Sequence, residues 1–532
     1  MRRGLALIAL VAGALVAGSA PAAVGPPRLL GLSISNGGHP FAGDTRQLAT
    51  VSPNGDGLRD RAIVRFHLDQ AATVELQVVA TVSQRVRPTV VWRLRRRLTA
   101  GPHRLTWKPA RATPDRTYLL RFVVTGGNGA RVYGFERPRP GRMTSGLVVR
   151  ILGVDAAFLP RSYVVGTQAS ASIATDARSL SVQFFGYPGP GSPGALDAKT
   201  GASAMSPAVT LDWRDHRDGP HVVGFSPSES WSSGLYFLRV TTSDGRVGYA
   251  PLVIRPRHLG EHRVAVVLPT NTWQGENVRD VNGDGWGDSW LASASSTTVS
   301  LSRPYLDSGI PYRFRAESGA VVSWLSRAGK HVDYLSDDDL AAVSSGEALR
   351  NAYDLVVFAG SEQYVGRRAY DVVRRFRDLG GRLMFLSGSN FRWQADRNGS
   401  TLRRGKQWRQ LGKPEAALVG VQFAASGRGG GKAYVVKGAS AEPWVFAATG
   451  LADGSTFGRV GTEVDSTSPQ SPPGTVVLAR ITDAIGRHDA EMTYYRTAAG
   501  AQVFAVGTRD FARWLDQPAV AQLVANVWAL LG

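Results

Sequence analysis

The sequence predicts a multidomain protein in which two all-β sandwiches are followed by an α/β domain with a mostly parallel sheet. Its 532 residues exceed what one hydrophobic core organises, so several domains are expected. The first half holds short apolar or alternating runs separated by turn residues, as in β-sandwiches. The second half alternates strand-like runs with helical periodicity, which is typical of a parallel sheet covered by helices.

Residues 24–143 are expected to form the first sandwich, because strand-like segments recur there at short intervals. These segments are Ala62–Leu68, Thr73–Val79, Thr89–Trp92, His103–Trp107 and Tyr118–Val124. The string Ser52–Asp60 (SPNGDGLRD), with Gly101–Trp107 and Tyr118–Phe122, resembles the immunoglobulin-like domains of flagellar hook-capping proteins. That resemblance implies a structural module rather than an active site.

Residues 144–258 are expected to form a second immunoglobulin-like sandwich. Ala169–Ile173, Leu180–Phe185 and Leu235–Thr241 are strand-like. Between them, Gly186–Pro207 is rich in Gly, Pro, Ser and Ala, which predicts a long loop.

Residues 259–532 are expected to form the α/β domain. The clearest pattern lies within Tyr353–Trp393, where the apolar runs Leu355–Phe358 and Leu383–Leu386 flank an amphipathic helix. Two glycines, Gly380 and Gly381, end that helix. The pattern predicts a βαβ unit, and therefore a parallel sheet of flavodoxin-like or amidotransferase-like type.

Other segments extend the same alternation of strands and helices. Val264–Leu268, His331–Leu335 and Val503–Val506 are expected strands, and Ser318–Ala328, Asp338–Arg350 and Val520–Leu531 are expected helices. Beyond about residue 395 the pattern becomes irregular and rich in glycine, which predicts a long insertion.

Polar residues follow both strands of the βαβ unit, as Ser361–Tyr364 and Ser387–Asn390. Ligands of parallel sheets bind beyond the carboxyl ends of the strands, so we expect a site here. Ser361 lacks the Gly-x-Ser-x-Gly setting of a nucleophile elbow, which argues against a serine hydrolase.

The first 23 residues read as a signal peptide. Arg2 and Arg3 precede the apolar run Leu5–Val16, and Ala20–Ala22 fits a cleavage site. We therefore expect a secreted, extracellular protein. Later segments are too short or too polar to span a membrane, so no transmembrane anchor is expected. The absence of cysteine excludes disulfides and a thiol nucleophile.

The formal net charge of +20 raises the possibility of nucleic-acid binding, which the distribution of charge disfavours. Of the 62 basic residues only 7 are lysine, and they are scattered rather than gathered in a stripe with aromatic residues. We expect no nucleic-acid partner.

An ordered set of strings in the second half resembles the large (beta) subunit of N,N-dimethylformamidase and its exported relatives. The resemblance covers about residues 225–530 and is far more specific as a set than any single string. The strings are Ser233–Tyr236, Leu268–Gln274, Ser302–Tyr305, Asp333–Leu340, Glu362–Tyr364, Phe385–Asn390, Trp408-Arg409 and Leu418–Val421.

The resemblance implies a mononuclear iron site built from two tyrosines and a glutamate, which hydrolyses a small amide. Iron in such a site polarises the carbonyl and activates water. Tyr364 matches one tyrosine ligand, whereas Glu276 stands where many relatives have the other. Glu276 and Glu362 are expected to share the catalytic site with Tyr364. The glutamate ligand is left open between Glu415 and Glu463.

A second metal is indicated by the segment 280–288 (DVNGDGWGD). Oxygen ligands would come from positions 1, 3, 5, 7 and 9 of an EF-hand-like loop, namely from Asp280, Asn282, Asp284, the Trp286 carbonyl and Asp288. Position 12 is Leu291 instead of the usual Glu, and the alternative is an ion-free turn.

Two functions are therefore expected from the sequence. The first is a diverged metal-dependent hydrolase of a small, non-peptide amide. The second is a non-catalytic extracellular binding or adhesion protein, in which the α/β domain is a calcium-stabilised scaffold. Fold alone does not separate them, because activity resides in sites.

Overall fold

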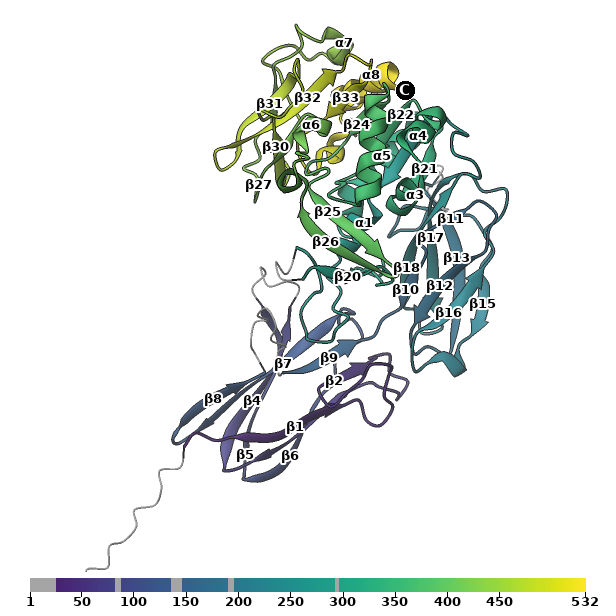
Figure 1. Ribbon diagram of the computed structural model, residues 1–532. Helices are drawn as coiled ribbons and strands as arrows, with labels where there is room; N and C mark the ends of the chain where they lie inside the picture. Colours follow the sequence, from purple (N-terminus) through teal and green to yellow (C-terminus); the bar gives the residue numbers. More distant parts are fainter. Residues whose placement is uncertain (1–24, 82–87, 135–145, 190–195, 292–295) are drawn as a thin grey trace, which may run out of the picture.

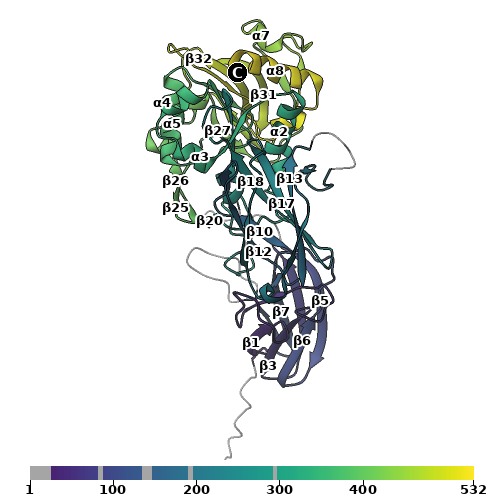
Figure 2. The ribbon, with the colours of Figure 1, turned by 90° about the vertical axis from the view of Figure 1, so that its right-hand side faces the viewer.

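A computed structural model describes residues 25–81, 88–134, 146–189, 196–291 and 296–532. The expected signal peptide lies outside these residues. The chain is mostly β, with 39% of residues in strands and 16% in helices. The first sandwich forms one end of an elongated molecule, and the helix-bearing C-terminal part forms the other (Figures 1 and 2).

The first sandwich packs a three-stranded sheet against a six-stranded one. Alternate side chains of its strands point inward, as in Ala72–Ala80, and close a core of Val, Leu and Phe. One sheet holds β1 (Leu29–Ser35), β3 (Ala62–Leu68) and β6 (Gly101–Trp107); the other holds β2 (Leu48–Val51), β9 (Leu147–Ile151), β7 (Thr117–Gly126), β4 (Ala72–Ala80), β5 (Thr89–Leu98) and β8 (Gly129–Tyr133).

The second sandwich also pairs a three-stranded sheet with a six-stranded one. The strands are β10 (Asp155–Phe158), β12 (Ala169–Ala174) and β16 (His221–Phe225) in the first, and β11 (Ser162–Val164), β18 (Val247–Arg255), β17 (Gly234–Thr242), β13 (Ser179–Tyr187), β14 (Ser203–Ala204) and β15 (Val209–Asp212) in the second. Phe185, Phe237 and Tyr249 of this sandwich belong to the same apolar core as the C-terminal part.

The C-terminal part is built on a mixed sheet of nine strands. Its order is β21 (Asp333–Ser336), β19 (Val264–Leu268), β22 (Leu355–Phe358), β24 (Arg382–Phe385), β33 (Gln502–Ala505), β32 (His488–Arg496), β31 (Val476–Ile485), β28 (Tyr434–Val436) and β29 (Thr456–Phe457). The pairings from β21 to β33 are parallel, and those from β33 to β29 are antiparallel.

The prediction of an α/β domain with a mostly parallel sheet is therefore wrong. The predicted βαβ unit is present, but half of the sheet is antiparallel, and the region is rich in strands. The difference comes from the stretch after residue 395, which was expected to be an irregular insertion. There β31 and β32 form a long hairpin that continues the sheet past β33.

Helices cover both faces of the parallel half. Helices α3 (Asp337–Ala342), α4 (Gly346–Ala352) and α5 (Arg367–Asp378) pack on one face, and α2 (Ser318–Arg327) and α8 (Pro518–Leu531) pack on the other. Short helices α1 (Thr270–Gly275), α6 (Ala416–Val419) and α7 (Pro443–Phe446) lie in connections.

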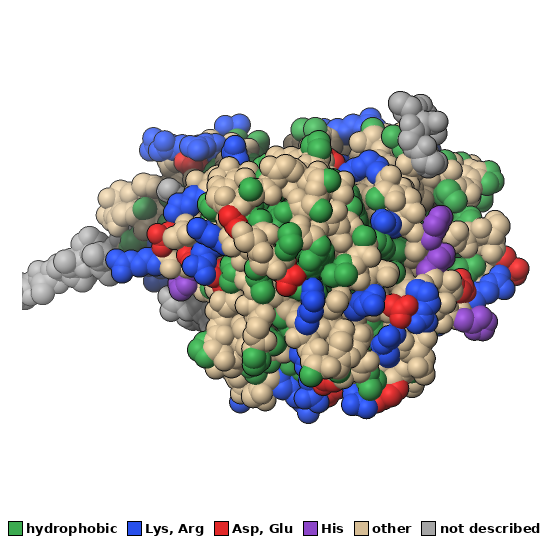
Figure 3. Space-filling view, turned by 90° about the horizontal axis from the view of Figure 1, so that it is seen from above, with side chains coloured by type: hydrophobic (Ala, Val, Ile, Leu, Met, Phe, Trp, Pro, Cys, Tyr) green, Lys and Arg blue, Asp and Glu red, His purple; other side chains and the backbone are tan. Residues whose placement is uncertain are grey.

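Two small sheets flank the main one. They contain β20 (Thr298–Ser300), β26 (Thr401–Gln407), β25 (Trp393–Asn398) and β23 (Tyr364–Val365) in one, and β27 (Gln422–Ser426) and β30 (Glu463–Ser466) in the other. Within the described ranges, no helix is both long and apolar enough to cross a membrane. In the view of Figure 3, basic and acidic side chains are interspersed over the surface.

Candidate functional site

Polar residues gather where four parallel strands end. The segments that follow β19, β22, β24 and β33 carry Glu276, Tyr364, Ser389 and Arg509 respectively, and all four side chains are buried. This arrangement matches the place where α/β sheets bind ligands.

Arg509 lies at the centre of this group. Its two terminal nitrogens donate to the two carboxylate oxygens of Glu276, at 2.7 and 2.6 Å, and its Nε donates to Glu317 at 2.6 Å. Glu463 lies 3.6 Å from the same guanidinium. Glu317 is also bonded to Arg313 at 2.8 Å. A buried guanidinium thus faces three carboxylates, and we call this group the Arg509 centre.

The pKa values of the two glutamates bonded to Arg509 are shifted in opposite directions. Burial raises the pKa of Glu276 above its ordinary value, although Arg509 counteracts the rise. Burial also raises the pKa of Glu317, but Arg509 and Arg313 outweigh it, and the net shift is downward. Glu276 therefore depends on one guanidinium for its charge, whereas Glu317 has two.

The strand β30 places two carboxylates on the same face, because alternate residues of a strand point the same way. Glu463 accepts a hydrogen bond from Gln363 at 3.2 Å and one from the Ser389 hydroxyl. Asp465 accepts the Ser389 backbone N–H at 2.7 Å. Burial raises the pKa of Asp465 to about 7, and nearby Glu463 adds to the rise.

Tyr364 is 2% exposed, and its ring packs edge-on against Trp290 with 4.5 Å between centroids. Burial raises the pKa of its hydroxyl, and the charges of Glu276 and Glu463 raise it further. The hydroxyl makes no hydrogen bond to any residue that the structure describes. Tyr364 thus lies near enough to Glu276 and Glu463 to feel their charges, with its phenol protonated.

Glu362 points to a different neighbour, Asp337, which follows β21. Burial raises the pKa of Glu362 well above its ordinary range, and Asp337 adds to the rise. Asp337 accepts hydrogen bonds from the Thr270 hydroxyl at 3.1 Å and the Asn271 backbone at 2.7 Å. Burial and Asp337 therefore favour the protonated form of Glu362, which is placed to share its proton with Asp337.

Several buried oxygens around this edge have no hydrogen-bond partner among the described residues. They are Ser318 Oγ, Ser387 Oγ, Asp465 Oδ1 and Asp510 Oδ1. Buried polar atoms are normally satisfied, so water or a small polar ligand would complete the bonding at this edge.

The residues present do not fit the iron site that the resemblance implies. One tyrosine position is Glu276, and both of its oxygens are taken by Arg509. The other position keeps its tyrosine, Tyr364. Of the two glutamates left open, Glu463 lies 3.6 Å from the Arg509 guanidinium, and Glu415 pairs with Arg409. No set of three or more His, Asp or Glu residues in the described part of the chain is arranged to hold a metal.

In the expected calcium loop, the carboxylates accept hydrogen bonds from backbone N–H groups of the loop itself. Asp280 accepts the N–H groups of Gly283 and Gly285, at 2.8 and 2.7 Å, and Asp288 accepts that of Val281 at 2.7 Å. Asn282 and Asp284 accept from residues two positions ahead. Burial raises the pKa of Asp284 to about 7, and Asp280 adds to the rise. Calcium binding stays a prediction.

Taken together, fold and site define a class of protein: a β-rich multidomain chain with a buried, charged polar centre at the carboxyl ends of parallel strands. The family described as N,N-dimethylformamidase beta subunit-like, C-terminal matches residues 197–522. The match covers more than half of the chain, so the chain belongs to this family, and the resemblance found in the sequence is confirmed. The first sandwich lies outside the match.

Among solved structures, three likenesses are weak. Escherichia coli alpha-2-macroglobulin activated by porcine elastase is 16% identical over 43% of this chain and 20% of that chain (TM-score 0.17). CBD12 from CALX1.2 is 11% identical over 37% of this chain and 79% of that chain (TM-score 0.15). The Yersinia pseudotuberculosis adhesin InvE is 14% identical over 39% of this chain and 56% of that chain (TM-score 0.14). The chain thus spans a fifth of the first structure. No curated protein matches the sequence.

Proposed function

We propose that this protein is a secreted, diverged amide hydrolase that acts on a small, non-peptide amide at the Arg509 centre without iron. One observation carries the proposal: a guanidinium is bonded to Glu317 and to both oxygens of Glu276, the residue that stands at one ligand position of the iron site that the resemblance implies. Membership of the family supports the amide as substrate class. The unsatisfied buried oxygens support a small polar ligand at the same edge.

In the proposed reaction, Asp465 is the general base. Its pKa of about 7 suits proton transfer near neutral pH, and its Oδ1 has no partner among the described residues. Asp465 takes a proton from water as the water oxygen bonds to the amide carbonyl carbon. Arg509 and the neutral Tyr364 hydroxyl stabilise the negative charge on the carbonyl oxygen. The C–N bond then breaks, the proton passes to the amine, and carboxylic acid and amine leave.

The test compares the full chain after metal removal and after incubation with iron(II). Formamide, acetamide and N,N-dimethylformamide are the probes, and released ammonia or dimethylamine is measured. We expect hydrolysis of at least one amide at equal rates with and without iron. D465N should lower the rate about 100-fold, whereas D483N, which changes an exposed aspartate of β31, should not. Strict dependence on iron, or no turnover of any probe, would overturn the proposal.

A further inference from the structure

The first sandwich lies outside the family match, yet a segment of the C-terminal part reaches it. This segment, residues 276–290, leaves the Arg509 centre at Glu276, touches the first sandwich at Trp286 and returns to the centre at Trp290. We call it the connecting loop. Both of its ends contact residues of the candidate site, so its shape bears on the geometry of that site.

At its tip, the connecting loop packs against the first sandwich through Trp286. Trp286 is 3% exposed and packs in a socket formed by Leu48, Val79, Leu119 and Val148. The approach is close: a Cβ on Gly285 would come 2.5 Å from Leu119. Thr81 of the first sandwich donates to the Gly285 carbonyl, and the Thr117 side chain bonds to Asp280.

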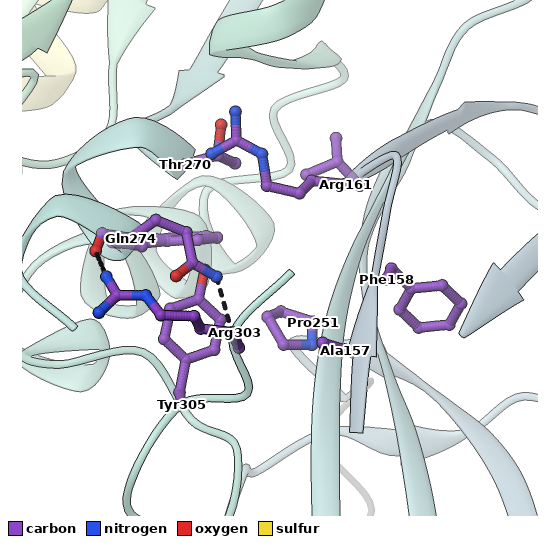
Figure 4. Close-up of a pocket in the computed structure, with 10 residues that line it drawn as sticks. Ala157, Phe158, Arg161, Pro251, Thr270, Gln274, Arg303 and Tyr305 are labelled. Carbon is purple, nitrogen blue, oxygen red and sulfur yellow. Dashed lines mark hydrogen bonds between the residues drawn. The ribbon is translucent and has the colours of Figure 1, made fainter. Parts of the chain in front are cut away.

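At its base, the connecting loop is held by one buried cation. Arg303, which is 2% exposed, donates to the carbonyls of Asn277 and Arg279, at 3.2 and 3.3 Å, and to that of Asp288. It also bonds to the carbonyl of Gln274, as Figure 4 shows. Arg303 thereby links the outgoing and returning segments of the connecting loop, so a shift of one segment is expected to move the other.

The returning end closes on the site. The Trp290 backbone N–H donates to the Gly275 carbonyl at 2.8 Å, directly beside Glu276. The Trp290 ring lies against Tyr364, and a Cβ on Gly275 would come 2.5 Å from the Trp290 ring and 3.2 Å from the Tyr364 ring. Little space therefore remains for Trp290 to shift without moving Tyr364.

We propose that the first sandwich is a positioning element for the candidate site, and that Trp286 is the positioning residue through which it acts. By seating Trp286, the first sandwich fixes the connecting loop, which in turn holds Glu276 beside Arg509 and Trp290 against Tyr364. The inference uses the location of the proposed site but not its reaction, so it can fail or succeed independently of amide hydrolysis.

The test uses the full chain labelled with 5-fluorotryptophan and observed by ¹⁹F NMR. W290F and W528F assign the resonances of Trp290 and of Trp528, which packs on Trp324 between helices α8 and α2. W286A should shift or broaden the Trp290 resonance and leave that of Trp528 in place. W286F, which refills the socket with an aromatic ring, should restore it.

A second variant changes the first-sandwich side of the contact with Trp286. L119A empties the socket within the first sandwich and should displace the Trp290 resonance in the same direction as W286A. V132A, a change at an exposed position of the first sandwich, is the matched control and should have no effect. An unchanged Trp290 resonance in folded W286A and L119A would overturn the proposal, as would equal displacement of the Trp528 resonance.

Discussion

Replacing Arg509 by glutamine tests how much the centre depends on its guanidinium. The change leaves Glu276 buried with no cation bonded to it, whereas Glu317 keeps Arg313. Breaking a buried ion pair by removing one partner costs about 3–5 kcal/mol. We expect R509Q to lose about 4 kcal/mol of unfolding free energy at about pH 8, mostly through Glu276.

The loss should depend on pH with a definite sign. The pKa of Glu276 is already raised, and without Arg509 it rises further. A carboxyl group whose pKa is raised in the folded state loses stability as pH rises from its unfolded value, about 4.3, to its folded value. Because the pKa of Glu276 is raised in the wild type too, the loss changes only between the two folded pKa values, by up to about 1.4 kcal/mol per unit of pH, and it should be smaller at about pH 5 than at about pH 8.

Guanidinium chloride unfolding, followed by circular dichroism at both pH values, measures the effect. R496Q is the matched control, because Arg496 forms an exposed pair with Glu442 at 3.3 Å that is worth at most about 1 kcal/mol. The double variant E276Q/R509Q should be less destabilised than R509Q, since no orphaned charge remains. A cost for R509Q below about 1 kcal/mol, equal at both pH values, would refute the reasoning.

Three further predictions address other carboxyl groups. E362Q should unfold with about the same free energy as the wild type at about pH 4 and be more stable at about pH 7, because the raised pKa of Glu362 makes the wild type lose up to about 1.4 kcal/mol per unit of pH above its unfolded value of about 4.3; no gain over the wild type in denaturant unfolding at pH 7 argues for a charged Glu362 in the fold. D284N should flatten the fall in melting temperature between about pH 5 and pH 8, because the raised pKa of Asp284 makes its charged form costly; an unchanged slope in scanning calorimetry counts against that cost. If the 280–288 loop binds calcium with a Kd of about 1 mM, then about 5 mM calcium should raise the melting temperature of the wild type at pH 8 and not that of D284N. Equal shifts of the melting temperature in both proteins would disprove the site.

Much of the C-terminal fold could be predicted from local pattern. The βαβ unit was evident because Leu355–Phe358 and Leu383–Leu386 are continuous apolar runs and Gly380 adopts a positive φ of 84° after α5. The antiparallel half was missed because β31 and β32 are strands whose polar and apolar residues mix, as in HDAEMTYYR. Their partners are set by the sheet they extend, which the local sequence does not reveal.

The candidate site was predicted in part. The carboxyl ends of the strands were the right place to find Tyr364 and Glu276 together, since topology alone brings those ends to one edge. Arg509, Glu317 and Asp465 were missed, because each is a single charged residue without a motif and far away in sequence. Their one signal is a charged residue within or beside an apolar segment, as with Arg509 after Val503–Val506.

In the proposed site, a guanidinium takes the place of iron. Metal analysis of the full-length protein, expressed with ample iron and purified without chelator, tests it most directly. We predict far less than one iron per chain, and the same low content in R509K, which keeps the positive charge. Iron near one per chain in the wild type, lost in Y364F, would contradict the account.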